Sequence, residues 1–310
     1  MRNRIVWILT LLVALSAAVA AAPASGDPPV SLIPDNALWV LHMDMARFRQ
    51  TRISDLVRDD RIPLFSVANA LMKSQSRIDL FKDTSAITFF GMGGHRDNVL
   101  VCLDGTIDRE YLITRLQQAE GYRRMTHGKY TVHRWNDTQF CVFVTDRLAL
   151  YSIHPLGEEA LTDVLDTLSG ARKNIGRSPL MAQFKRMPAK AYLKAAAEKM
   201  SAFEHRGHGP KMLEKVGLAL FVVMETGEDF QATLTLTAAD PETARNIEQI
   251  VNGFIALARM NHEARERDLA LLNGIRTTRD RHILEIALTY PVADLMTMLE
   301  GRRGLPFQKK

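Results

Sequence analysis

The chain has 310 residues, 46% of them hydrophobic and 24% charged, and a formal net charge of +5. So large an apolar share excludes an intrinsically disordered chain, and the length suits one large domain or two small ones. Without Arg2 and Arg4, which lie in a predicted leader, the charge is +5 − 2 = +3, which is too small to indicate binding to nucleic acid.

The N-terminal segment has the pattern of a secretory signal peptide. Arg2 and Arg4 precede an apolar run from Ile5 to Leu15, and the tripeptide Ala-Val-Ala at 18–20 fits a cleavage site. We therefore predict a signal peptide over 1–24 and an extracytoplasmic location, either periplasmic or secreted. The alternative is an uncleaved anchor, because the apolar run approaches the roughly 20 residues that cross a bilayer. Contact with a membrane is expected only in that case.

A linker over 25–37 leads into a predicted first half over 38–175. Apolar runs at 39–43, 86–90 and 98–103 indicate strands, and Thr106 or Asp108 is expected to cap a helix. Three short strands are predicted between 130 and 153, because turn residues at 136–137 and 146–147 separate apolar runs. A helix over 156–168 closes this half.

The second half, over 176–300, is better marked. The unbroken apolar run at 218–224 is typical of a strand covered on both faces, and the alternation at 230–238 predicts a strand with one buried face. Asp240 is a predicted N-cap and Pro241 the first residue of a long helix. This helix carries apolar residues at helical spacing, which predict one stripe facing a sheet: Ile247, Ile250, Val251, Phe254 and Ala258.

The remaining elements repeat the pattern of hairpin and helix. A short helix is predicted after Pro179, and the segment at 191–197 fits either a strand or a helix. A helix over 264–272 precedes a hairpin of 275–278 and 282–290, and Pro291 opens a last helix. The residues at 301–310 form a basic tail.

These elements predict an α+β fold in which antiparallel sheets carry helices packed mainly on one face. Each half reads as a hairpin, a capped helix, a further hairpin and a closing helix. We therefore predict an internal duplication, which would fail as a hypothesis if the two halves superposed no better than unrelated α+β units.

The decapeptide Ser-Leu-Ile-Pro-Asp-Asn-Ala-Leu-Trp-Val at 31–40 leads into a predicted strand. Together with the late unit of strand, Asp-Pro and helix at 236–259, it resembles the layout of exported bacterial proteins of unknown function found in planctomycetes and similar bacteria. The resemblance implies an exported α+β protein. It implies no catalytic residue, cofactor or ligand for any position of this chain.

Cys102 and Cys141 are the only cysteines, and both fall in predicted strands of the first half. An exported protein meets oxidising conditions, so a disulfide between neighbouring strands is one interpretation. The other is a pair of buried thiols that pack as small apolar residues, since each cysteine lies within an apolar stretch.

Thr233, Thr235 and Thr237 form the most distinctive polar surface that the sequence predicts. The three hydroxyls line one face of a strand, where they are a candidate binding face for a ligand or a partner. The alternative is the solvated side of an antiparallel sheet, which threonine suits equally well.

Other motifs indicate neither a metal nor a cofactor site, and we predict neither. His205 and His208 lie in a glycine-rich stretch without a further ligand at a usual spacing. His262 and Glu263 begin a zinc-protease pattern, but Glu266 stands where the second histidine is required. The glycines at 91–94 lie between two predicted strands, whereas a phosphate-binding loop precedes a helix.

We therefore expect a non-enzymatic envelope protein that binds an unknown protein or small ligand, or has a structural role. The alternative is an extracytoplasmic hydrolase whose site is assembled from distant residues. A third possibility is a role at a lipid surface through the basic tail and an uncleaved anchor.

Overall fold

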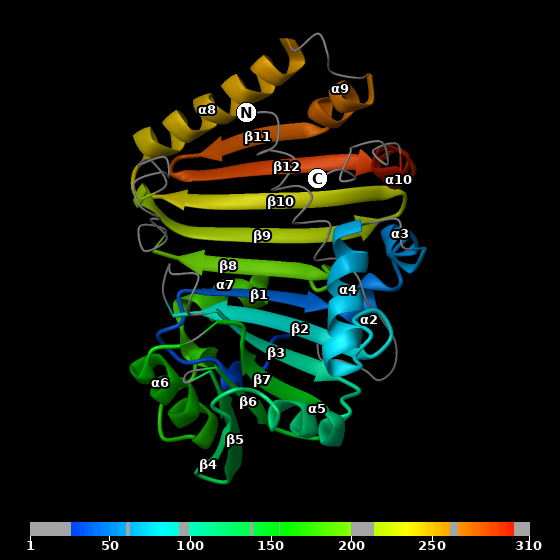
Figure 1. Cartoon of the computed structure of the whole chain (residues 1–310). Helices are drawn as coiled ribbons and strands as arrows, with labels where there is room; N and C mark the ends of the chain where they lie inside the picture. Colours follow the sequence, from blue (N-terminus) through cyan, green and yellow to red (C-terminus); the bar gives the residue numbers. More distant parts are fainter. Residues whose placement is uncertain are drawn as a thin grey trace.

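The computed structural model describes residues 26–59, 63–92, 99–136, 139–154, 156–199, 214–260 and 266–300. Its strands form one antiparallel sheet of twelve, in the order β11-β12-β10-β9-β8-β1-β2-β3-β7-β6-β5-β4 (Figure 1). The predicted α+β class is confirmed, but one continuous sheet replaces the separate sheets expected from the sequence.

The strands of the first part of the chain are β1 (Trp39–Asp44), β2 (Thr84–Gly91), β3 (Val99–Gly105), β4 (Arg123–His127), β5 (Tyr130–Trp135), β6 (Gln139–Phe143) and β7 (Leu148–Ser152). Those of the second part are β8 (Leu193–Glu198), β9 (Val216–Thr226), β10 (Asp229–Ala238), β11 (Ile275–Asp280) and β12 (Ile283–Pro291). The segment at 191–197 is thus a strand.

The α-helices are α2 (Met45–Phe48), α3 (Ile53–Arg58), α4 (Pro63–Ser76), α5 (Arg109–Leu116), α6 (Glu158–Ser169), α7 (Pro179–Arg186), α8 (Pro241–Met260), α9 (Glu266–Asn273) and α10 (Val292–Glu300). Short 3-10 turns are η1 (Val30–Leu32) and η3 (Ile175–Arg177). Asp240 caps α8 as predicted, because its carboxylate accepts a hydrogen bond from the Thr243 N–H at 2.6 Å.

The two faces of the sheet are covered by different helices. On the back face, α6 and α7 bury a core that includes Val40, Phe90 and Phe184. On the front face, three smaller cores lie under α2, α3, α9 and α10, under α8, and under α5. Figure 1 shows α4 and α5 in front of the strands and α7 behind them. Most helices therefore lie on the front face, as the sequence predicts.

The segment at 25–37 is not a loose linker. Within its described part, Leu32 and Ile33 are buried in the back core, and the Ile175 N–H donates to the Ile33 carbonyl at 2.8 Å. The segment packs against the core because burying its apolar side chains is more favourable than leaving them in water.

The two halves have a related strand order. In each half three consecutive strands form a meander, β1-β2-β3 or β8-β9-β10, and a helix then leads to strands that return beside the third. The closing helices differ, since α6 packs on the back face and α10 on the front. Duplication remains a hypothesis.

Trp39 lies flat against the backbone of β2. Its strand partner is Gly91, and a Cβ at Gly91 would lie 2.7 Å from Cε2 of the indole and 2.9 Å from Cζ2. A side chain at position 91 would therefore displace the ring, so a glycine is required here for close approach.

We expect Gly91→Ala to lower the free energy of unfolding by about 1–3 kcal/mol, since the added methyl overpacks the site. The Trp39 emission spectrum should shift as the ring moves. Gly253→Ala is the matched control, because no atom lies within 4 Å of its added Cβ and alanine favours an exposed helix position. Equal unfolding midpoints for the two variants would contradict this account.

His42 is a buried imidazole on the back face. It is 1% exposed, its Nδ1 lies 2.8 Å from the Thr88 hydroxyl, and its Nε2 has no hydrogen-bond partner in the part of the chain that the structure describes. Burial, and secondly the charge of Lys194, lowers the pKa of His42 to about 3. The ring is therefore neutral in the folded protein.

The imidazole of His42 takes up a proton near pH 6.5 in the unfolded chain but stays neutral at that pH in the folded protein. The contribution of His42 to the free energy of unfolding is therefore fully present only above that pH. Its contribution should fall by up to about 1.4 kcal/mol per pH unit as the pH decreases toward the folded pKa. Urea unfolding from pH 7 to 4 should show a shallower decline for His42→Gln than for the wild type. His282→Gln, in an exposed turn, should keep the wild-type slope.

Candidate functional site

A single row of side chains crosses the whole front face of the sheet. Each residue is the direct cross-strand partner of the next, in every one of the twelve strands. The row reads Arg124, His133, Cys141, Tyr151, Val101, Phe89, Leu41, Ala195, Phe221, Leu234, Ile286 and Thr277. Between β6 and β12 it is apolar apart from the Tyr151 hydroxyl.

The middle of this front row is incompletely covered. Phe89, Leu41, Phe221 and Leu234 are all only partly buried. Val101, Cys141 and His133, on the other side of Phe89, are buried. The next row on the same face is covered by helices, and its members Met43, Leu193, Val223 and Leu288 are buried. The open row therefore results from where the helices lie, because both rows are equally apolar.

A second partly open row runs beside the first, on the side away from the buried one. It contains Trp135 on β5, Val99 on β3 and Trp39 on β1, and Trp39 pairs with Ala197 on β8. All four side chains are partly buried. The front face therefore presents two adjacent apolar rows, and both tryptophans of the chain after position 24 belong to them.

Helix α8 presents an exposed apolar flank on this face. Ile250, Phe254 and Leu257 are 43%, 58% and 65% exposed. The opposite flank bonds to the edge strand β11, since Arg279 Nε donates to Glu248 at 2.7 Å and the Thr277 hydroxyl donates to Asn252 at 3.0 Å. By helical geometry, the apolar flank therefore faces away from β11, on the side of the central strands.

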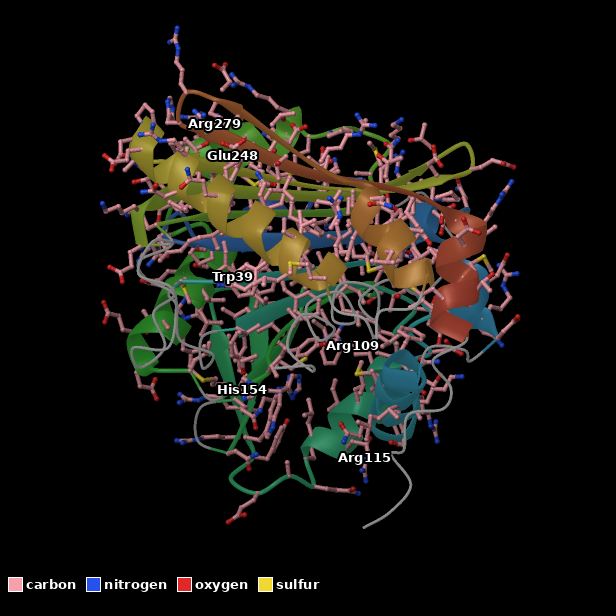
Figure 2. All side chains as sticks on the ribbon, turned by 90° about the horizontal axis from the view of Figure 1, so that it is seen from above. Trp39, Arg109, Arg115, His154, Glu248 and Arg279 are labelled. Atoms are coloured by element: carbon pink, nitrogen blue, oxygen red, sulfur yellow. The ribbon has the colours of Figure 1, made fainter. Side chains whose placement is uncertain are left out.

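The sequence predicts one apolar stripe on α8, and the structure divides it. Ile247 and Val251 pack on the sheet, whereas Ile250 and Phe254 do not. The buried residues of α8 all lie in its first half, and Figure 2 shows the helix running obliquely to the strands. The sequence carries a signal of this exposure in Leu257 and Met260, which extend the apolar surface beyond the width that one sheet contact covers.

The β4 end of the front row is positively charged. Arg124 is exposed beside His133, and the guanidinium of Arg109 on α5 lies 5.3 Å from the centroid of the Phe143 ring. His133 is 3% exposed, and its Nδ1 lies 2.9 Å from the Tyr122 hydroxyl. Burial, followed by the charges of Arg124 and Arg109, lowers the pKa of His133.

Two further histidines contact polar side chains away from the front row. The His42 and Thr88 pair joins an imidazole to a hydroxyl, but each residue is 1% exposed, which excludes a substrate. His127 Nε2 lies 2.9 Å from Asp166 Oδ1 on the back side. Among the described residues, no group of three or more His, Cys, Asp and Glu could hold a metal ion.

The structure places both cysteines as free thiols. Cys102 on β3 belongs to the back core and Cys141 on β6 to the front core under α5, with β7 between the two strands. Two strand spacings separate them by about 10 Å, beyond the roughly 7 Å that a disulfide bridges. The interpretation as a disulfide is therefore wrong for this structure, because β7 inserts between strands that the sequence suggested were neighbours.

The predicted threonine face lies on the back of the sheet, away from the front rows. The three threonines of β10 are partly buried. Their partners on β9 are Val222 for Thr233, Leu220 for Thr235 and Leu218 for Thr237. The latter two leucines pack against the back core. A binding role for the three hydroxyls stays a prediction.

Several sequence predictions lie outside the described residues. These are the signal peptide, His205 and His208, the dipeptide at 262–263 and the basic tail. No helix in the described part of the chain is both long and apolar enough to cross a membrane.

No protein-family model matches the chain, and no curated protein does. The solved structures that it is similar to include crystal forms III, I and IV of TP0453, with 10%, 9% and 9% sequence identity and TM-scores of 0.47, 0.45 and 0.45. Forms III and I cover 89% and 90% of this chain and 98% of theirs; form IV covers 88% and 96%. Similarity at this level carries no inference about function. The resemblance to planctomycete proteins stays a prediction.

Burial raises the pKa of both thiols, to about 12 for Cys141, so the reactive thiolate is scarce in the folded protein. We expect neither cysteine to react with Ellman's reagent in native buffer at pH 8, and both to react in 6 M guanidinium chloride. The protein should release two equivalents of chromophore on unfolding without any reductant. Release that requires a reductant would contradict the free-thiol state.

Proposed function

We propose that this chain is a non-enzymatic binding protein of the bacterial envelope, exported by its N-terminal leader, that holds an apolar ligand against the front face of its sheet. The observation that carries the proposal is the exposed apolar flank of α8, on the same face of the sheet as a row of only partly buried apolar side chains. Exposed apolar side chains that gather on one surface mark a binding site.

The sheet supplies a rigid floor for the ligand. Leu41, Phe89 and Phe221 sit on central strands whose neighbours hold them through backbone hydrogen bonds on both sides. Such side chains lose little freedom when a ligand covers them, so less free energy is spent on ordering the site.

The flank of α8 supplies a second apolar surface for the ligand. A chain held between floor and flank would lose water on both sides, at about 0.8 kcal/mol for each methylene group buried. Ten such groups give about 8 kcal/mol, the free energy of micromolar binding, from which the cost of the lost ligand freedom is subtracted, so the affinity is weaker than micromolar.

The uncharged dye N-phenyl-1-naphthylamine tests the proposal, because its fluorescence emission rises in apolar surroundings. It carries no negative group that would bind to arginine side chains. The full chain without its leader should bind it. The double variant Phe254→Ser/Leu257→Ser should weaken binding about tenfold, since two exposed apolar contacts worth about 0.7 kcal/mol each are removed.

Gln249→Ser is the matched control, because Gln249 is exposed on α8 but belongs to neither the apolar flank nor the sheet contact. It should leave the dye affinity unchanged. All three substituted side chains are exposed, so the thermal midpoint should stay at the wild-type value. The proposal is overturned if the wild type does not bind the dye, or if the double variant binds it as tightly as the control does.

A further inference from the structure

Strand β11 forms one edge of the sheet, and half of its backbone groups point outward. The Thr289 N–H donates to the Gly274 carbonyl, so the residues of even number in this pairing direct their backbone groups toward β12. The N–H and C=O groups of Ile275, Thr277 and Arg279 therefore point away from the sheet. None of them has a hydrogen-bond partner in the part of the chain that the structure describes. Such a row of groups is a template for a further strand.

Helix α8 lies beside this edge and contacts it only through front-face side chains. These contacts are the bonds of Arg279 to Glu248 and of Thr277 to Asn252, which leave the outward backbone groups of β11 free. Figure 2 looks down on this edge and shows β11 running beside α8. The strand is also regular, because its pairing with β12 runs from 275 to 280 without a bulge and it contains no proline. A further strand can therefore pair along its whole length.

The back face of β11 carries one positive and one negative side chain. Arg276, Thr278 and Asp280 alternate with Thr277 of the front row, so all three lie on the back face, and all three are exposed. Neither Arg276 nor Asp280 forms an ion pair with any residue that the structure describes. Thr278 stands midway between these two charges. Turning the strand end for end about Thr278 therefore exchanges the positions of the positive and the negative side chain.

Two antiparallel copies of β11 use these charges in one register. With the two-fold axis at Thr278, Arg276 of each copy lies directly opposite Asp280 of the other. An axis at Arg276 or Arg279 would set an arginine opposite itself, and an axis at Asp280 would set two carboxylates together. An axis at Thr277 would bring no opposite charges together. Opposite charges in directly opposed positions stabilise a strand pair and like charges destabilise it, so the charges select the register centred on Thr278.

The other edge of the sheet, at β4, lacks this self-complementarity. Its charged side chains are Arg123 and Arg124, with His127 when protonated, and the strand contains no carboxylate. Two copies of β4 would bring only positive side chains together, which is unfavourable. Charges of one sign are a usual protection of an edge strand against pairing. The edge at β4 is therefore protected, and the edge at β11 is suited to a second copy of itself.

We propose that two copies of this chain associate through β11, antiparallel and in the register centred on Thr278, so that the two twelve-stranded sheets become one. An interface with two-fold symmetry must be self-complementary, and the pattern of Arg276 and Asp280 about Thr278 meets this condition. The axis is perpendicular to the sheet at the edge, so both front faces lie on the same side of the dimer. The exposed flanks of the two α8 helices then belong to one surface.

Charge reversal tests the two ion pairs. Sedimentation equilibrium of the full chain without its leader should show a dimer at micromolar concentrations. Arg276→Asp and Asp280→Arg each set like charges opposite each other twice, so each should raise the dissociation constant about tenfold or more. An equal mixture of the two variants should recover the wild-type value, because every aspartate then lies opposite an arginine. Arg115→Asp on α5, remote from β11, is the matched control and should dimerise as the wild type does.

A disulfide tests the position of the axis. The two copies of Thr278 would form a pair without backbone hydrogen bonds between them, with the Cα atoms about 4.5 Å apart. This distance suits a disulfide, so Thr278→Cys should yield a covalent dimer in a glutathione redox buffer. Thr289→Cys on β12 is the matched control, because it is exposed on the same face. Three strand spacings, about 14 Å, separate its two copies, so it should stay unlinked.

The substituted side chains are all exposed, so each variant should keep the wild-type thermal midpoint and remain interpretable. A wild type that stays monomeric at micromolar concentrations overturns the proposal. So does a mixture of the two charge-reversed variants that is no more dimeric than either variant alone. Linking of Thr278→Cys no faster than of Thr289→Cys would show that any dimer uses another surface. None of these measurements involves the apolar site, so their failure leaves the proposed function to its own test.

Discussion

The antiparallel pairing of β1 with β8 is the interaction on which the rest of the structure depends. It joins residues 39–43 to residues 193–197, more than a hundred positions later, in unbroken register. Side chains on one face of paired strands alternate with a period of two, so a slip of one residue at this pairing would exchange the faces of everything beyond it. The front row is continuous across twelve strands only because this register aligns the two halves.

A sheet of this width has more apolar surface than its helices cover. The back face is closed over the first half by α6 and α7, but on the front face the helices stand at the ends of the strands and at the two edges of the sheet. Helix α8 is long enough to cover several strands, yet it is buried only at its first turns. Its Asp240 cap and Arg279 contact fix its first turns beside the edge strand, while the middle of the row and the flank of α8 are not covered by it.

Local patterns predicted the elements because the physics that forms them is local. The alternation at 230–238 and the Asp240-Pro241 cap each depend on neighbours within a few residues, and both are confirmed. Strand β4 was missed, since Arg123-Arg-Met-Thr-His127 has no apolar run and forms a strand only because β5 pairs with it. The disulfide interpretation of the two cysteines fails for the same reason, because the insertion of β7 between β3 and β6 is a long-range event. No sequence pattern indicated the front row, whose members come from every strand.

The candidate site therefore belongs to neither half alone. Its partly open floor comes from Leu41 and Phe89 in the first half and from Phe221 in the second, and its apolar flank comes from α8 in the second. A half that ended at β1 or began at β8 would expose the central strand edge, where unpaired backbone groups favour aggregation. The same pairing that removes this edge also brings the floor residues of both halves onto one surface.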